Sequence, residues 1–221
     1  MTSEELAKYI DHTLLAPEAT SLEITNLCAE ARKFNVAAVC FSPSFLPLSV
    51  GLVPTEIAIA CVVGFPSGAH AGDVKAFEAT RAIENGATEI DMVLNLGFIY
   101  SANWLELGDE VAAVRKAIST ASKKQALLKV IIESSALTDQ QIIAACRVAV
   151  ANGADFVKTS TGFHKSGGAT VHAVELMRLT VGDLIGVKAS GGIRTRETAL
   201  EMINAGATRL GTSATGAILA S

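Results

Sequence analysis

The sequence has no cluster of lysine and arginine residues and no apolar stretch long enough to cross a membrane. Its 221 residues carry a formal net charge of −4. Nucleic acids and anionic membrane surfaces are bound by basic patches, so we expect neither partner, although a small anionic ligand needs only a local field. The longest apolar run, residues 57–65, is too short for a transmembrane helix. The acidic residues 1–5 lack an apolar signal core, and we therefore expect a cytoplasmic protein.

Several catalytic and redox motifs are also absent. No H-E-x-x-H spacing joins the histidines, so no metal site is expected and each histidine is expected in a loop or on the surface: His12, His70, His164 and His172. There is no G-x-S-x-G, G-x-x-x-x-G-K-[ST] or G-x-G-x-x-G motif, and no cofactor is expected. Without a C-x-x-C pair, the cysteines are expected to be reduced packing residues: Cys28, Cys40, Cys61 and Cys146.

Aromatic residues are scarce, and small and branched residues take their place. Aromatics make up 5% of the sequence, whereas hydrophobic residues make up 50%, carried by Ala, Val, Ile and Leu. Side chains of this kind pack helices onto both faces of a buried parallel sheet. The composition therefore favours an α/β fold.

Short apolar segments alternate with amphipathic helical segments along the chain. Strands are expected at residues 9–13, 36–41, 56–65, 89–94, 127–133, 155–158, 185–188 and 208–212. Helices are expected at residues 3–9, 20–34, around 45–50, 71–84, 104–120, 138–150, 170–179 and 195–203. Gly86, Gly153 and Gly206 each follow a helix, where glycine readily takes a positive φ. This order predicts a (β/α)8 TIM barrel forming a single domain, residues 1–221, rather than a doubly wound open sheet.

Ionisable residues interrupt four of the expected strands, at Asp91, Lys129, Glu133, Lys158 and Lys188. A buried charge is costly unless paired, so any one of them alone is best explained by a structural ion pair. Together, Lys158 and Lys188 on adjacent strands would bring two ammonium groups close, and repulsion and desolvation would depress the pKa of an amine. A carboxylate such as Asp91 could then move protons. The pattern predicts Schiff-base chemistry without deciding which lysine is the nucleophile.

Two glycine-rich loops follow the last two expected strands. Residues 191–194 read Gly-Gly-Ile-Arg and residues 211–213 read Gly-Thr-Ser. In a barrel of this type the loops after strands seven and eight often hold a phosphate group, because glycine lets backbone N–H groups approach an anion closely. A phosphorylated substrate is therefore expected.

Two long lysine motifs indicate a family. Residues 157–163, Val-Lys-Thr-Ser-Thr-Gly-Phe, and residues 187–194, Val-Lys-Ala-Ser-Gly-Gly-Ile-Arg, resemble the deoxyribose-phosphate aldolase family. The likeness extends to residues 10–15, 40–43, 63–66, 89–93 and 128–133. The resemblance implies a class I, metal-free aldolase of deoxyribonucleotide catabolism, which reversibly splits 2-deoxy-D-ribose 5-phosphate into acetaldehyde and D-glyceraldehyde 3-phosphate.

The resemblance also implies a role for each residue that matches a family motif. Lys158 would be the Schiff-base lysine, Lys188 the lysine that perturbs it, and Asp91 the proton donor or acceptor. Thr161 would help to order a relay water, and Cys40 would lie near the substrate. The phosphate would be contacted by Gly162, Gly191, Gly192, Gly211 and Ser213.

The sequence departs from some family members at two positions that directly follow phosphate-binding candidates. Phe163 stands where some members have a lysine, and Ala214 where a second serine often follows the first. These departures bear on phosphate affinity and proton transfer. A homo-oligomer, dimer or tetramer, is expected, although alanine-rich helix faces are equally well explained by packing on the barrel.

Two other functions fit the same residues. One is a Schiff-base barrel aldolase or transaldolase that acts on a longer sugar phosphate. The other is a barrel that binds a phosphosugar but has lost activity, which would bind the ligand without forming an imine that borohydride can trap. The presence of both lysines and Asp91 favours an active enzyme.

Overall fold

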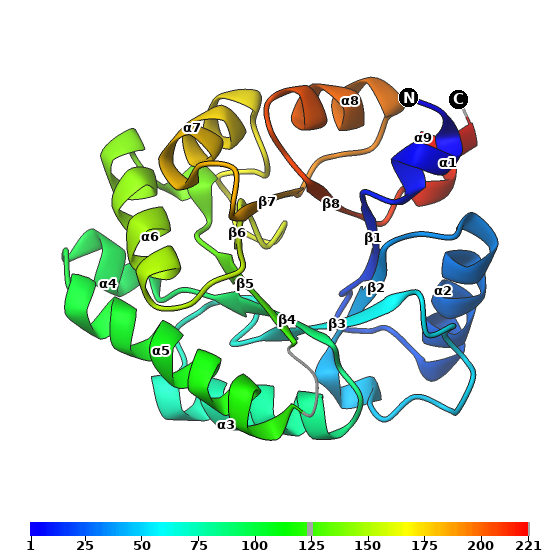
Figure 1. The fold of residues 1–221 in the computed structure, drawn as a ribbon, viewed down its shortest axis with the longest axis horizontal. Coiled ribbons are helices and arrows are strands. Elements are labelled where there is room, and N and C mark those ends of the chain that lie inside the picture. Colours follow the sequence, from blue (N-terminus) through cyan, green and yellow to red (C-terminus); the bar gives the residue numbers. More distant parts are fainter. Residues whose placement is uncertain (123–125, 221) are drawn as a thin grey trace.

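The computed structural model describes residues 1–122 and 126–220, and its eight parallel strands form a closed barrel. The strands are β1 (Ile10–Leu14), β2 (Ala38–Phe41), β3 (Ala58–Val63), β4 (Glu89–Val93), β5 (Leu127–Ile131), β6 (Phe156–Lys158), β7 (Gly186–Ser190) and β8 (Arg209–Thr212). Each strand pairs with the next, and β8 pairs with β1 to close the ring (Figure 1). The predicted (β/α)8 barrel is confirmed, and the open sheet is excluded.

Helices surround the ring of strands (Figure 1). They are α1 (Ser3–Ala7), α2 (Ser21–Phe34), α3 (Gly72–Glu84), α4 (Leu96–Tyr100), α5 (Trp104–Ala121), α6 (Asp139–Ala151), α7 (Val171–Val181), α8 (Arg196–Asn204) and α9 (Thr215–Ala220), with 3-10 turns η1 (Pro43–Phe45) and η2 (Ser134–Ala136). Thr2, Thr20 and Thr138 begin their helices with reciprocal capping boxes. The first helix packs beside the last. None of the helices in residues 1–122 and 126–220 has the length and apolar character needed to cross a membrane.

The tight turns that lead from helix to strand use glycine as predicted. Gly86, Gly153 and Gly206 have φ values of 105°, 95° and 110°. These values lie in the region that a Cβ atom disfavours, so glycine ends α3, α6 and α8 at little conformational cost. Each turn then feeds the chain into the amino end of the next strand.

The predicted helix at residues 45–50 is wrong. Residues Pro43–Phe45 form the 3-10 turn η1, and Leu46 is extended, with φ −89° and ψ 149°. The residue before a proline is disfavoured in the helical region, and Pro47 follows Leu46 directly. Helices α4 and α9, and the turn η2, were not expected from the sequence.

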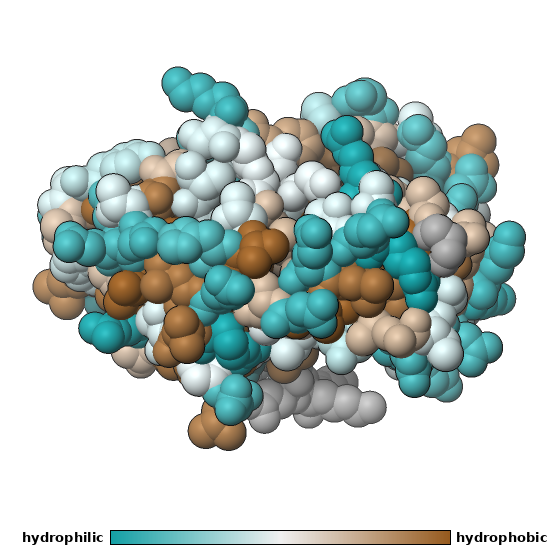
Figure 2. All heavy atoms as spheres, turned by 90° about the horizontal axis from the view of Figure 1, so that it is seen from above, coloured by the Kyte–Doolittle hydropathy of each residue, from teal (hydrophilic) through white to brown (hydrophobic). Residues whose placement is uncertain are grey.

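Apolar side chains fill the layer between the strands and the helices. Val39 and Phe41 of β2 belong to this main core, whereas Cys40 between them belongs to a smaller separate cluster with Ala60 and Val62. Successive side chains of a strand point to opposite faces, so the smaller cluster lies inside the barrel. On the outer face seen in Figure 2, hydrophobic residues lie in patches among hydrophilic ones.

Candidate active site

Charged side chains occupy much of the barrel interior. In β4, Ile90 and Met92 pack in the core beneath the helices, so Asp91 between them points inward. Lys129 occupies the same position in β5, where its backbone pairs with that of Asp91. Both side chains are fully buried. The period of two along each strand therefore brings ionisable groups to one axis.

Asp91 lies at the centre of these side chains, which form a charged column made up of Asp11, Glu89, Asp91, Lys129, Lys158, Lys188 and Arg209. Its Oδ2 atom accepts hydrogen bonds of 2.7 Å from Lys158 Nζ and 2.7 Å from Lys188 Nζ. Its Oδ1 atom accepts a 2.9 Å hydrogen bond from Lys129 Nζ. Lys158 and Lys188 also pair directly in the register of β6 and β7. The structure therefore brings together the two lysines that the sequence predicts to be neighbours.

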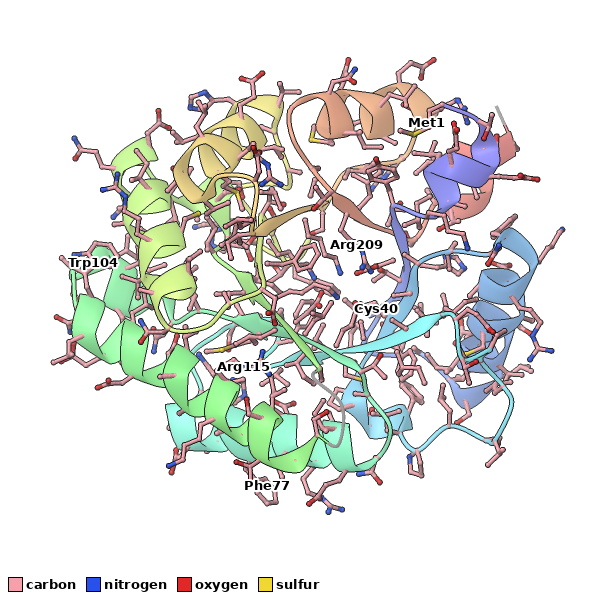
Figure 3. All side chains as sticks on the ribbon, in the orientation of Figure 1. Met1, Cys40, Phe77, Trp104, Arg115 and Arg209 are labelled. Atoms are coloured by element: carbon pink, nitrogen blue, oxygen red, sulfur yellow. The ribbon has the colours of Figure 1, made fainter. Side chains whose placement is uncertain are left out.

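A second layer of ion pairs lies around Asp11 of β1. Asp11 accepts hydrogen bonds from Lys188, from Lys129 at 3.3 Å and from Arg209 at 2.6 Å. Glu89 lies 2.5 Å from Lys129 and 3.4 Å from Arg209. Figure 3 shows Arg209 near the centre of the barrel, far from the peripheral helices. Every charge in the column therefore has an opposite charge within contact distance, as burial requires.

The three lysines of the column differ in pKa. Burial lowers the pKa of Lys158, and the nearby Lys188 lowers it further, so that it stays below 10.5 despite the attraction of Asp91. Burial also acts on Lys188, but Asp11 and Asp91 outweigh it and raise its pKa. The pKa of Lys129 is raised well above 10.5, because Asp11, Asp91 and Glu89 together outweigh its burial. Lys158 therefore has the amine that is most readily deprotonated.

The number of charges explains this difference. The column contains three carboxylates, Asp11, Glu89 and Asp91, and four cationic side chains, Lys129, Lys158, Lys188 and Arg209. Lys158 contacts one of the carboxylates, whereas each other cation contacts at least two. When Lys158 is neutral the column is balanced, with three charges of each sign. Loss of its proton is thus the least costly way to remove the excess positive charge.

A cavity of about 450 Å³ opens above the column at the carboxyl ends of β1, β6, β7 and β8. It is lined by residues 13–18, 158, 161–163, 190–194 and 211–213. Lys158, the last residue of β6, lies at its floor and is 3% exposed. Lys188 and Asp91 lie beneath, fully buried. Only one amine of the column is thus in the cavity wall.

One side of the cavity carries backbone amides suited to an anion. Gly162, Gly191 and Gly192 line this side and have φ values of 84°, 85° and 83°, a left-handed backbone that also occurs in anion-binding nests of N–H groups. In the described part of the chain, the N–H groups of Gly162, Gly192 and Ser213 have no protein acceptor. Arg194 lines the same side. These features can hold a phosphate group.

Three of the predicted site residues are placed differently from the rest. Cys40 is fully buried and does not line the cavity, although its thiol lies close enough to Lys188 and Asp91 for their charges to act on its pKa, which burial raises. A Cβ atom on Gly211 would lie 3.1 Å from Lys188 Cε, so a larger residue there would press on the side chain of that lysine. The Thr161 hydroxyl donates a 2.6 Å hydrogen bond to Glu133, and its role in ordering a water stays a prediction.

Asp11, Glu89 and Arg209 belong to the site but were not predicted as site residues from the sequence. Each lies on a strand that was correctly predicted, and Asp11 belongs to one of the matching family motifs. Their partners lie far away in the sequence: Asp11 contacts Arg209 across 198 positions. A signal was available, because an ionisable residue among apolar strand neighbours indicates burial, as it did for Asp91.

His12 contradicts the expectation that each histidine lies in a loop or on the surface. It lies in β1, is 3% exposed, and contacts Thr215 Oγ1 at 2.8 Å and Glu30 Oε2 at 3.0 Å. Its ring therefore joins the first strand to the beginning of α9. The four cysteines are free and buried, as expected. Among the described residues, no group of three or more His, Cys, Asp or Glu side chains is arranged to hold a metal ion.

Comparison with known proteins shows the family of the chain, and the result agrees with a barrel that has a lysine in the wall of its cavity. The model of the DeoC/LacD family aldolases matches residues 5–220. The chain is therefore an aldolase built on a (β/α)8 barrel. It belongs to the DeoC/LacD family, as its lysine motifs predict.

Similar proteins support this assignment over nearly the whole chain. The deoxyribose-phosphate aldolases of Kocuria rhizophila and Corynebacterium diphtheriae are each 52% identical to it, and each match covers 99% of this chain and 97% of the relative. A crystal structure of a putative deoxyribose-phosphate aldolase from Coccidioides immitis has a TM-score of 0.93 and 40% identity, covering 100% of this chain and 86% of that one. The tetrameric deoxyribose phosphate aldolase from Aeropyrum pernix has a TM-score of 0.88 and 33% identity, covering 100% and 92%.

Proposed function

We propose that this aldolase reversibly splits 2-deoxy-D-ribose 5-phosphate into acetaldehyde and D-glyceraldehyde 3-phosphate through a Schiff base on Lys158, in deoxyribonucleotide catabolism. The observation that carries the proposal is the contact of both lysine amines with Asp91 Oδ2, directly beneath a cavity with anion-binding amides. The names of the relatives supply the substrate. The site residues supply the chemistry.

Lys158 begins the reaction as the neutral amine. It attacks the aldehyde carbon of the open-chain sugar, and the resulting carbinolamine loses water to give an iminium. The leaving hydroxyl needs a proton, and Lys188 is the nearby group that remains protonated because its pKa is raised. Asp91 accepts hydrogen bonds from both amines, so it passes protons between them.

Cleavage of the carbon–carbon bond follows from the iminium. The electron pair of the bond between C2 and C3 moves toward the cationic nitrogen as a water molecule in the cavity takes the proton of the C3 hydroxyl, and this step releases glyceraldehyde 3-phosphate. The enamine left on Lys158 takes a proton at C2, and water then hydrolyses the iminium to free acetaldehyde and the amine. The phosphate is held by the amides of Gly162, Gly192 and Ser213, with Gly191 and Gly211 giving the close approach that these contacts need.

Covalent trapping tests the proposed function. The protein is incubated with acetaldehyde and borohydride, its intact mass is measured, and the modified lysine is located by peptide mapping. An ethyl adduct on Lys158 is expected. An adduct on Lys188 would reverse the roles of the two lysines, and no adduct on a protein that still binds phosphate would contradict the aldolase mechanism.

We also propose that the chain forms a homo-oligomer, a dimer or a tetramer. Val74 and Phe77 of α3 are 49% and 67% exposed, and their spacing places them on one face of the helix. Figure 3 shows Phe77 at the periphery of the molecule. The Aeropyrum pernix relative is described as tetrameric. Light scattering should give the mass of two or four chains, and the mass of one chain would contradict the proposal.

We propose that the protein works in the cytoplasm. Its four thiols are all free and buried, which suits a reducing compartment. Cell fractionation should recover the aldolase activity with cytoplasmic markers.

A further inference from the structure

Glu133 is a buried carboxylate that has no part in the proposed chemistry. It lies in the loop after β5, is 2% exposed, and has a left-handed backbone with φ 57° and ψ 54°. Among the described residues it forms no ion pair within 4.0 Å. Left-handed backbone is uncommon outside glycine, and an unpaired buried carboxylate is costly. Two unfavourable features at one residue require a compensating role.

Within the described residues, the side-chain hydrogen bonds of Glu133 all come from Thr161, in the wall of the cavity. The Thr161 N–H lies 3.2 Å from each carboxylate oxygen, and the Thr161 hydroxyl donates to Oε2 at 2.6 Å. The backbone strengthens the link between the two loops, because Ser134 N–H donates to the Thr159 carbonyl at 2.7 Å and Ile132 N–H donates to the Lys158 carbonyl at 3.0 Å. The loop after β5 therefore holds the loop after β6 at several points.

These contacts decide which amides face the ligand. Of three successive N–H groups, that of Thr161 is taken by Glu133, and that of Phe163 donates to Thr161 Oγ1 at 3.1 Å. The Gly162 N–H between them has no protein acceptor in the described part of the chain. Because the Thr161 hydroxyl donates to Glu133, its oxygen is left to accept from Phe163. One carboxylate thus ties back the amides on both sides of Gly162.

We propose that Glu133 is a positioning residue that acts through Thr161 to aim the Gly162 amide at the phosphate of the substrate. The proposal rests on the proposed function, since it takes Gly162 as a phosphate ligand. The negative charge of Glu133 would by itself weaken the binding of a nearby anion, so Glu133 must help binding through geometry. Both of its carboxylate oxygens accept hydrogen bonds, and they accept them from the N–H and O–H groups of Thr161.

Glu133→Gln tests this role with little change in shape. Glutamine presents one acceptor and one NH₂ donor, so one Thr161 donor would face another donor and the loop would lose its fixed orientation. The expected result is that the Kd for inorganic phosphate rises by roughly 10-fold, as for the loss of one charge-assisted hydrogen bond. The KM for deoxyribose 5-phosphate should rise in parallel. The kcat and the rate of borohydride trapping with acetaldehyde should change far less.

Glu110→Gln is the matched control. Glu110 is a second buried glutamate, 4% exposed, that pairs with Lys75 away from the cavity. Its replacement should lower stability without changing the Kd for phosphate. This comparison separates positioning of the Gly162 amide from a general loss of stability, which would move the control variant as well.

Phosphate binding measured by calorimetry decides the outcome. A Kd for Glu133→Gln within about twofold of wild type would overturn the proposal, as would an equal rise in Glu110→Gln. If Glu133→Gln does not fold, Thr161→Val carries the test: weakened phosphate binding supports the proposal and an unchanged Kd overturns it. A wild-type protein that binds phosphate but traps no acetaldehyde would contradict the proposed function alone, because phosphate binding needs no imine.

Discussion

At the scale of single residues, Lys158 and Lys188 show how environment separates two identical side chains. They pair in register on neighbouring strands and share one carboxylate oxygen of Asp91. Lys188 has Asp11 as a second anionic partner, whereas Asp91 is the one anionic partner of Lys158 in the part of the chain that the structure describes. The extra partner raises the pKa of Lys188, and the pKa of Lys158 remains lowered. One amine is thereby suited to attack a carbonyl and the other to supply a proton.

Replacement of Lys158 and replacement of Lys188 should reduce imine formation to different extents. Lys158→Ala should abolish imine trapping and lower kcat/KM by about 10⁴-fold or more, since Lys158 carries the only lysine amine that lines the cavity among the residues that the structure describes. Lys188→Ala should leave an imine that forms roughly 10²-fold more slowly, as for loss of a proton donor. The exposed Lys165→Ala is the control and should behave as wild type. Equal trapping by both active-site variants would contradict the two-lysine mechanism.

The rate of imine formation should depend on pH through the amine of Lys158. Attack needs the neutral amine, so the rate rises as pH increases through its pKa, with a midpoint below 10.5 because that pKa is lowered. Removal of the Lys188 cation raises the pKa of Lys158, so Lys188→Ala should move the midpoint to higher pH. If the midpoint rises by about one pH unit, the neutral fraction of the amine at pH 7 falls about tenfold. Stopped-flow trapping across pH measures this midpoint in the wild type and in Lys188→Ala. A midpoint that stays the same or falls in the variant would contradict the effect of Lys188 on the pKa of Lys158.

The sequence was sufficient to predict the lysines and Asp91 as neighbours, but not their charge balance. Ionisable residues on apolar strands are visible in the sequence. Their partners depend on barrel closure, which brings Arg209 of β8 to Asp11 of β1. The contact between Glu133 and Thr161 likewise depends on how two loops meet. Local patterns carry no information about such contacts.

At the scale of elements, the loops after β6 and β7 touch so closely that glycine is required between them. A Cβ atom on Gly168 would lie 2.2 Å from the Gly191 carbonyl oxygen. Because the obstacle is backbone, it cannot rotate away as a side chain would. The Gly191–Gly192 turn is therefore held in place by the loop that precedes α7.

Gly168→Ala should displace this turn and weaken phosphate binding. A misplacement of about 1 Å in a binding group can cost roughly 10²-fold, so a large rise in the KM for deoxyribose 5-phosphate is expected. Acetaldehyde trapping on Lys158 should persist. Gly216→Ala, within α9, is the control, since a Cβ atom there would lie 3.6 Å from the Phe34 ring, an ordinary van der Waals distance. Steady-state kinetics with both variants measures the effect, and an unchanged KM in Gly168→Ala would exclude this steric role.

The elements themselves were largely predictable, because hydrophobic period and turn glycines are local signals. The strands and the long helices were located within a few residues. The helix expected at residues 45–50 does not form because Pro47 disfavours helical backbone at Leu46, although the neighbouring residues are apolar. The short helices α4 and α9 contain too few turns to show a clear periodic pattern.

At the scale of the whole molecule, the charged column joins strands from both halves of the chain. Lys129 contacts Asp11, Glu89 and Asp91, and so connects β1, β4 and β5. These ion pairs take the place that apolar layers fill in many barrels of this class. The centre of the fold is therefore stable only while its charges remain matched.

Lys129→Met should test this dependence. Among the described residues, Lys129 is the one cation that Asp11, Glu89 and Asp91 all share, so its removal takes a buried partner from each of them, and breaking a buried ion pair typically costs about 3–5 kcal/mol. The free energy of unfolding in urea should fall by that amount. Lys116→Met, on the exposed face of α5, is the control and should change stability by no more than about 0.5 kcal/mol. Similar values for both variants would show that the column contributes little to stability.

The cavity wall formed by residues 13–18 contributes none of the column's charges. Leu14, Leu15, Ala16 and Pro17 are apolar side chains at the carboxyl end of β1, and none of them takes part in the ion pairs of the column. Directed evolution toward new aldehyde acceptors can vary these positions, because a change in side-chain size alters the shape of the cavity without removing a charge from the column. The residues that can change the range of substrates are thus different from the residues that carry out the reaction, although both border one pocket.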